Sequence, residues 1–284
     1  MKRLIYFAAA LIVIAIGSAS CEQTGKVDNV DSLAVDSLDS INANDSVEFT
    51  IRRFTFTDHR YNESKDTTAS YSVIIDLPQG PRSLVRSISQ WLNEVLEVET
   101  EANMFDSSHD AMRQLAKAFY DKNTERGPKL TFNASITKVF EDSVYVTYEY
   151  KGSVYNGGEN DMPYFYGMTF DKATGKAISN DLFTKTEGLT DLISKHLMAY
   201  FGDTTIKDLS DVMYETAVAE LPMPEHAAWM VDSGMVFCYG AYEIAPYTAG
   251  MPKCTIPLSE LKPFMVKEEK KSEEQTKEAE KTKK

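Results

Sequence analysis

A strand-rich block in the middle of the chain constrains its fold more than any other feature. Between Val144 and Tyr150, apolar residues alternate with Tyr145, Thr147 and Glu149, the period of two typical of a half-buried β-strand. Similar strand-like stretches cover 130–140 and 162–170, and a turn with Gly175 follows at 171–176. The block therefore predicts a sheet of neighbouring strands.

Helix-like stretches stand on both sides of this block. Apolar residues recur at helical spacing over four stretches, 84–96, 108–122, 189–201 and 209–221. Short strands are expected at 48–56, 71–77, 227–231, 235–239 and 253–257. This mixed order predicts an α+β fold, with an antiparallel sheet packed with amphipathic helices.

The N-terminus has the pattern of an export signal. Lys2 and Arg3 precede an apolar run at 4–16, which is followed by small residues and Cys21. The order resembles a bacterial lipobox, which predicts a signal peptide over 1–20 and a lipid on Cys21. The lipid would anchor the chain to a bacterial membrane of the cell envelope, the outer membrane being favoured, with the folded body outside the cytoplasm. An ordinary signal peptide and an N-terminal membrane anchor are the alternatives.

The remaining chain divides into tether, body and tail. Residues 21–47 form an acidic tether that is expected to be disordered, and Lys267 to Lys284 form a charged, disordered tail. Between them, the body spans 48–266 in two segments, about 48–185 and 186–266. The tether repeats Asp, Ser and an aliphatic residue, so it is either a plain acidic spacer or an O-glycosylated one, with Ser32, Ser37, Ser40 and Ser46 as acceptors.

Composition and motifs exclude several classes of function. The formal charge of -13 argues against a nucleic-acid binder, and 43% hydrophobic residues are ample for a core. Three cysteines cannot form a four-thiolate zinc site. The sequence has no nucleophile elbow, phosphate loop, dinucleotide-binding glycine motif or His-Glu-x-x-His, and its four histidines are isolated. We therefore expect no enzyme activity, no cofactor and no metal.

Several strings of residues carry a family resemblance. They include Tyr-Val-Thr-Tyr-Glu-Tyr at 145–150, Tyr-Asn-Gly-Gly at 155–158, Thr-Gly-Lys at 174–176 and Tyr-Glu-Ile-Ala-Pro-Tyr-Thr-Ala-Gly at 242–250. Together these strings resemble the extracellular domain of the RsiV-type anti-sigma factors. That domain is shared with accessory regions of peptidoglycan deacetylases and with envelope lipoproteins. The family often has a histidine where Glu159 stands here, so no role of that histidine is carried over.

The resemblance implies an envelope binding module. Because members of the family include a receptor for lysozyme, the implied partner is a lysozyme-like muramidase or cell-wall peptidoglycan. The alternatives are a structural or assembly lipoprotein that binds other envelope proteins, and an accessory of a peptidoglycan-modifying enzyme. The candidate ligand-contacting residues lie in two aromatic loops: Tyr155, Gly157, Gly158, Tyr164, Tyr166, Tyr242, Glu243 and Tyr247.

Two cysteines stand at positions that could face each other. If strands 235–239 and 253–257 pair antiparallel about a centre near Pro246, Cys238 lies opposite Cys254. Residues directly opposed in this way are close enough for a disulfide, and export would allow the thiols to oxidise. Two buried free thiols are the alternative.

Overall fold

A six-stranded sheet forms the first half of the chain. In the computed structural model, the described residues are 48–96, 108–122, 129–178, 180–183, 186, 188–202 and 208–265. All of them belong to one unit, Ser46–Lys284. The strands follow one another in sequence order across the sheet: β1 Thr50–Tyr61, β2 Thr67–Gln79, β3 Leu130–Glu141, β4 Tyr145–Tyr155, β5 Met162–Asp171 and β6 Ala177–Ile178.

One pair in this sheet differs from the expected antiparallel arrangement. β2 and β3 run parallel, with Ala69 opposite Leu130 and Ile75 opposite Ile136, whereas the other neighbouring strands are antiparallel. The connection between β2 and β3 contains two helices, which return the chain to the end of the sheet where β2 began. A parallel pair requires such a crossover.

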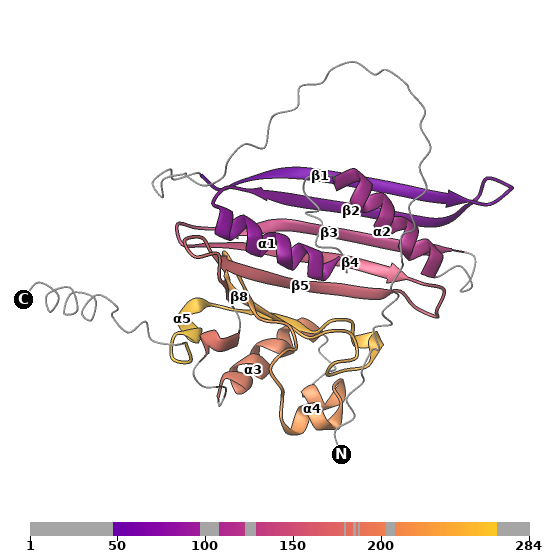
Figure 1. Cartoon of the computed structure of the whole chain (residues 1–284). Coiled ribbons are helices and arrows are strands. Elements are labelled where there is room, and N and C mark those ends of the chain that lie inside the picture. The colour runs from indigo at the N-terminus through magenta and orange to yellow at the C-terminus, as the bar shows by residue number, and fades with distance from the viewer. Residues whose placement is uncertain are drawn as a thin grey trace, which may run out of the picture. The chain divides into compact units, whose positions relative to one another are not determined.

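The two crossover helices cover one face of the sheet, which we call the helix face (Figure 1). They are α1, Arg82–Val95, and α2, Ser108–Lys122. α1 begins directly after Pro81, whose fixed φ suits the start of a helix, and it buries Leu84, Ile88, Trp91 and Leu92. The alternating side chains of the strands complete this core, including Val73, Ile75, Ile136, Val146 and Tyr148. The predicted α+β class is confirmed.

The second half of the chain contains a smaller sheet and the remaining helices. The order β7-β8-β9 joins Trp229–Val231, Gly234–Cys238 and Lys253–Ile256, all antiparallel. The helices are α3 Leu189–Phe201, α4 Glu215–Ala219 and α5 Leu258–Leu261, with 3-10 turns at Asn180–Leu182, Leu209–Asp211 and Tyr247–Ala249.

The helix expected over 209–221 is broken into two pieces. A 3-10 turn is closed by a capping box in which the Asp208 side chain accepts from the N–H of Ser210. The N–H of Tyr214 then donates to the carbonyl of Ile244, 2.9 Å away, instead of to a carbonyl one turn earlier. This tertiary hydrogen bond replaces a helical one, so a continuous helix was the wrong prediction.

The two halves join through the face of the sheet opposite the helices. Trp229, fully buried, lies against Gly167, where an added Cβ would stand 2.5 Å from the indole ring. The indole Nε1 donates to the carboxylate of Glu149 at 3.3 Å, and the N–H of Met230 donates to the Thr169 hydroxyl at 2.9 Å. These buried polar contacts fix β7 on β4 and β5.

Candidate binding surface

Two loops that are far apart in sequence meet at the surface. One follows β4 and leads into β5, and the other joins β8 to β9. The hydroxyl of Tyr247 bridges them, because it donates to the backbone carbonyl of Asp161 at 2.7 Å and lies 3.1 Å from its carboxylate. We call this surface the aromatic platform and define it by Asp161, Tyr242, Tyr247 and the hollow described next.

The hollow beside this bridge has a volume of about 600 Å³. Its lining comes from both loops and the start of β5: Asn160, Pro163, Pro246, Tyr247, Thr248 and Gly250. It is open and shallow, and most of its lining is apolar. A surface of this kind suits a protruding side chain or a sugar ring better than an enclosed small molecule.

Tyr242 is displayed by a strained turn beside the hollow. Its φ of 68° lies in the left-handed region, and its side chain is 50% exposed. Its ring lies 5.6 Å from that of Tyr247, at an angle of 34°. A non-glycine residue in this conformation must be held there by its surroundings.

Glu243 supplies the restraint. Its half-buried carboxylate accepts hydrogen bonds from the backbone N–H groups of Gly240 and, at 2.9 Å, Glu225. Burial raises the pKa of Glu243, although these hydrogen bonds act in the opposite direction. This residue therefore shapes the loop from within.

The predicted ligand residues do not all share one surface. Tyr242 and Tyr247 lie on the platform, and Gly157, with φ of 88°, and Gly158 belong to the turn before Asp161. The remaining three tyrosines lie in strands of the large sheet.

Tyr164 and Tyr166 are half-buried on the helix face, where the Tyr150 ring packs against both at 5.9 and 5.0 Å. Tyr166 also stacks on His226 at 4.2 Å. Tyr155 is the last residue of β4, directly before the loop that leads into β5, and pairs with Thr131. These three side chains belong to the sheet rather than to the platform.

Sequence reasoning missed Asp161 and the lining of the hollow. Asp161 stands 86 positions from its partner Tyr247, and no local pattern distinguishes it from other loop aspartates. Its role became visible only because the fold brings the two loops together.

The predicted disulfide is wrong, because the register of β8 and β9 differs by one residue. Phe237 pairs with Cys254, and Cys238 pairs with Lys253. Side chains alternate along a strand, so this shift places the two sulfurs on opposite faces. Both cysteines are free and buried, and burial raises the pKa of each thiol to about 12.

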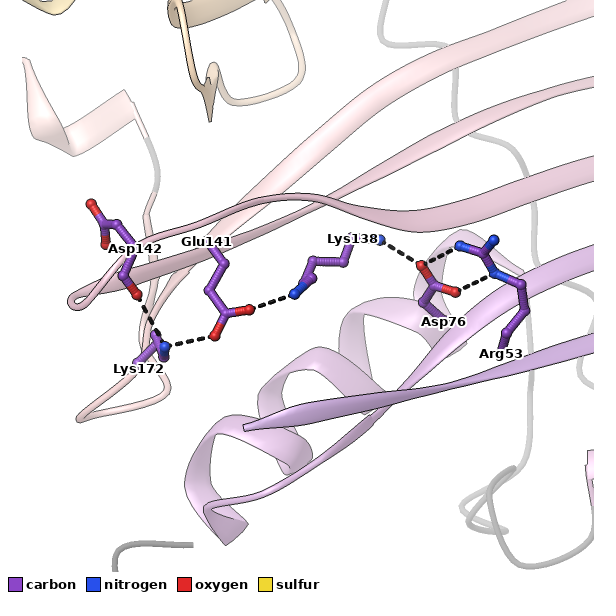
Figure 2. Close-up of polar contacts among 6 residues, drawn as sticks. All are labelled: Arg53, Asp76, Lys138, Glu141, Asp142 and Lys172. Atoms are coloured by element: carbon purple, nitrogen blue, oxygen red, sulfur yellow. Dashed lines mark hydrogen bonds and ion pairs between the residues drawn. The ribbon is translucent and has the colours of Figure 1, made fainter. Parts of the chain in front are cut away.

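A row of charged residues at the end of the sheet resembles a binding site, but its side chains are paired with one another and link neighbouring strands (Figure 2). Asp76 is fully buried and accepts two hydrogen bonds from the Arg53 guanidinium, at 2.8 and 3.0 Å. The second carboxylate in the row is that of Glu141, which accepts hydrogen bonds from the ammonium groups of Lys138 and, at 2.7 Å, Lys172. Burial opposes the ionisation of Glu141, but these hydrogen bonds outweigh it and its pKa is lowered.

Several predicted features lie outside the described residues. They are the signal peptide, the lipidated Cys21, the tether with Ser32, Ser37, Ser40 and Ser46, and the tail. Within the described part of the chain, no three His, Cys, Asp or Glu residues are grouped so that they could hold a metal ion. No helix among the described residues has the length and apolar character needed to cross a membrane.

The comparisons with known proteins agree with this fold. Residues 180–259, which include Tyr242 and Tyr247, match the family model described as "Protein of unknown function (DUF3298)". No curated protein matches the chain.

Two solved structures share the architecture. A DUF3298 family member from Bacteroides fragilis NCTC 9343 has a TM-score of 0.58 and 20% identity, and the match covers 78% of this chain and 94% of that one. A DUF3298 family protein from Pseudomonas aeruginosa PAO1 has a TM-score of 0.53 and 16% identity, over 77% and 95% of the two chains. At these identities the likeness concerns the fold alone.

Proposed function

We propose that the chain is a non-catalytic binding module of the bacterial cell envelope, and that the aromatic platform contacts its partner. The observation that carries the proposal is the bridge from Tyr247 to Asp161, which joins two loops into one surface with an exposed tyrosine and a hollow. Tyrosine suits such a role, because it offers a large amphipathic contact at a low cost in side-chain entropy.

The charge around the platform favours a basic protein as the partner. Glu159, Asp161 and Glu225 are exposed near the two tyrosines, and the whole chain carries a formal charge of -13. Complementary charge steers association and disfavours partners of like charge. A lysozyme-like muramidase has the required chemistry, and the resemblance to the RsiV-type extracellular domain supports the same choice.

Binding to lysozyme tests the platform directly. Tyr242→Asn removes the exposed ring, and asparagine tolerates the left-handed backbone conformation better than most residues. We expect this variant to bind lysozyme at least tenfold more weakly than the unaltered protein, with an unchanged unfolding temperature. The matched control is Tyr61→Asn, which removes a 60% exposed tyrosine from the end of β1 and should leave binding unchanged.

A parallel measurement with purified sacculi separates the possible partners. Retention on sacculi without binding to lysozyme would assign the platform to cell-wall glycan. Equal binding of lysozyme by the Tyr242→Asn variant and the unaltered protein would contradict the role of the platform. Binding to neither partner would contradict the proposed function.

The envelope location rests on the lipobox-like sequence before Cys21. We expect the mature chain to begin at Cys21 and to carry acyl chains on that cysteine. Mass spectrometry of the protein extracted from membranes checks this. Retention of residues 1–20, or an unmodified N-terminus at Glu22, would disprove the lipid anchor.

A further inference from the structure

The face of the large sheet opposite the helices carries a second surface of different chemistry. The strand register aligns the side chains of this face in rows, and six of the ten side chains in the two rows described next are small and polar. One row runs across five strands, through Thr57, Ser72, Asn133, Ser153 and Pro163. The next row runs through Thr55, Ile74, Ser135, Lys151 and Phe165.

These side chains are available to solvent. Thr55, Thr57 and Asn133 are exposed, and Ser72, Ser135 and Ser153 are partly exposed. We call these six residues the hydroxyl face. Neighbouring strands lie about 4.7–4.9 Å apart, so the face offers hydroxyl and amide groups at a regular spacing across the sheet.

Two lysines gather at one end of the hydroxyl face. The Nζ atom of Lys253 lies 3.8 Å from the centre of the Phe165 ring, and that of Lys151 lies 5.2 Å from it. The electron-rich face of an aromatic ring attracts cations, which holds both ammonium groups near one point. Both ammonium groups therefore lie beside this ring.

The charge of one lysine is compensated, and that of the other is not. Lys151 forms an ion pair with Glu149, whose second oxygen accepts from the Trp229 indole, so both carboxylate oxygens are occupied. Among the described residues, Lys253 forms no ion pair, and its side chain is exposed. One uncompensated positive charge thus lies beside a neutral, hydroxyl-rich face in an otherwise acidic chain.

We propose that the hydroxyl face and Lys253 together bind an acidic glycan, that is, a polyhydroxylated chain bearing carboxylates. A sugar carboxylate would meet the ammonium groups of Lys253 and Lys151, while the sugar hydroxyls exchange hydrogen bonds with Ser153, Asn133 and Ser135. The Phe165 ring offers an apolar edge for the sugar ring. This site adjoins the aromatic platform at Pro163, which lines the hollow and pairs with Ser153, but it uses different contact residues and is tested independently of the proposed muramidase contact.

The composition of the face favours a glycan over an acidic peptide. An extended peptide is recognised by pockets for alternate side chains or by pairing along the edge of a sheet. Four of the six residues of the hydroxyl face, Ser72, Asn133, Ser135 and Ser153, lie on β2, β3 and β4, whose backbone groups are paired with a strand on each side, while Thr55 and Thr57 lie on the edge strand β1. Apart from Phe165 and Pro163, Ile74 is the one apolar side chain in the two rows, so the rows offer few contacts for apolar side chains of a peptide.

Three matched probes test the inference with the full mature chain at 0.15 M salt. Tetragalacturonate carries carboxylates on a sugar chain, its fully methylated ester has the same sugars without the charge, and tetraglutamate has the charge without the sugars. At this ionic strength repulsion from the acidic body is screened beyond about 8 Å, so local contacts decide the affinity. We expect calorimetry to show binding of tetragalacturonate at least tenfold tighter than binding of either other probe.

Variants then locate the site. Lys253→Gln should weaken binding of tetragalacturonate at least tenfold, and Lys253→Arg should restore most of it. Lys195→Gln, which removes an exposed lysine from α3, and Tyr242→Asn, on the platform, should bind as the unaltered protein does. Thermal unfolding checks that every variant is folded.

The possible outcomes separate clearly. Equal binding of the ester would show that the carboxylate is not recognised, and equal binding of tetraglutamate would indicate an acidic peptide instead. Undiminished binding by the Lys253→Gln variant, or no binding by the unaltered protein, would overturn the inference.

Discussion

Gly167 shows how a single missing methyl group shapes this protein. The space that a side chain would fill is occupied by the indole of Trp229, whose Cγ lies 2.5 Å from the position of an added Cβ. Trp229 is fully buried and cannot swing out without exposing a large apolar surface. The union of the two halves of the chain therefore depends on glycine at this position.

The variant Gly167→Ala tests that dependence. The added methyl group must displace either the indole or β5, so we expect the free energy of unfolding to fall by about 1–3 kcal/mol. Urea unfolding measures this change. Gly158→Ala is the control, because the nearest atoms to its added Cβ are 3.9 Å away, and its cost should stay within about 0.5 kcal/mol. Equal costs for the two variants would contradict the packing argument.

Little of this residue-level detail could be predicted from the sequence. Gly167 stands in a strand pattern with nothing to mark its partner 62 positions later, and the Cys238–Cys254 pairing failed by one position. The centre of a hairpin with a long loop is not fixed by its sequence, whereas side-chain direction reverses with every residue. Prediction of the register was therefore weaker than prediction of the strands.

At the scale of elements, the hydrophobic pattern predicted the helices and strands whose apolar residues pack into the core. The helices expected at 108–122 and 189–201 match α2 and α3, and the strands at 130–140 and 162–170 match β3 and β5. The pattern failed at 209–221, because the hydrogen bond from Tyr214 to Ile244 is tertiary. It also gave no sign of the parallel pair, since strand direction depends on how the chain returns and not on any one strand.

Asp76 stabilises the point where that parallel pair ends. The ladder of β2 and β3 stops at Ile75 and Ile136, and the next free donor, the N–H of Lys138, is satisfied by the Asp76 carboxylate at 3.1 Å. The same carboxylate holds Arg53 on β1. Three strands are therefore joined by one buried side chain.

We expect Asp76→Asn to lower the free energy of unfolding by about 1–2 kcal/mol. The amide keeps one acceptor but loses the charge-assisted pair with Arg53, and the exposure of Arg53 to solvent limits the loss. Asp110→Asn breaks an exposed ion pair with Arg113 on α2 and should cost no more than about 0.5 kcal/mol. If both variants lose the same stability in urea, Asp76 is not the junction described here.

For the whole molecule, buried ionisable groups predict a loss of stability at alkaline pH. Burial raises the pKa of Cys238 and of Cys254 from 9.0 to about 12, and it raises the pKa of Tyr148 and Tyr239 above their ordinary 10.0. The unfolded chain therefore releases these protons at lower pH than the folded chain does. The free energy of unfolding is therefore unaffected by these groups below about pH 9, and it falls as the pH rises from 9 towards 12.

The midpoint of urea unfolding should thus be level from pH 7 to 8.5 and lower at pH 10.5. In the double variant Cys238→Ala, Cys254→Ala, the fall should begin nearer pH 10, where only the tyrosines remain to titrate. A midpoint that does not change up to pH 10.5 would show that these groups are accessible in the folded protein.

The candidate surface was predictable only in part. Tyr242 and Tyr247 stand in a string distinctive enough to attract attention, and both lie on the platform. Asp161 and the hydroxyl face depend on long-range pairing, because Thr57, Ser72, Asn133 and Ser153 become neighbours only through the registers of three strand pairs. Serine, threonine and asparagine are common on any strand, so nothing in the local sequence indicates that the strand register brings these residues together.

The parallel pairing of β2 with β3 also determines how the sheet can be assembled in time. The β1–β2 hairpin and the β3–β4–β5 meander each join neighbours in sequence, whereas Ala69 must find Leu130 across two helices. Closing that long loop costs entropy before its contacts are gained, so such a step is slow. We therefore expect two early folding units and a late docking step. Pulse-labelled hydrogen exchange would show this as protection of β4 amides before those that link β2 to β3.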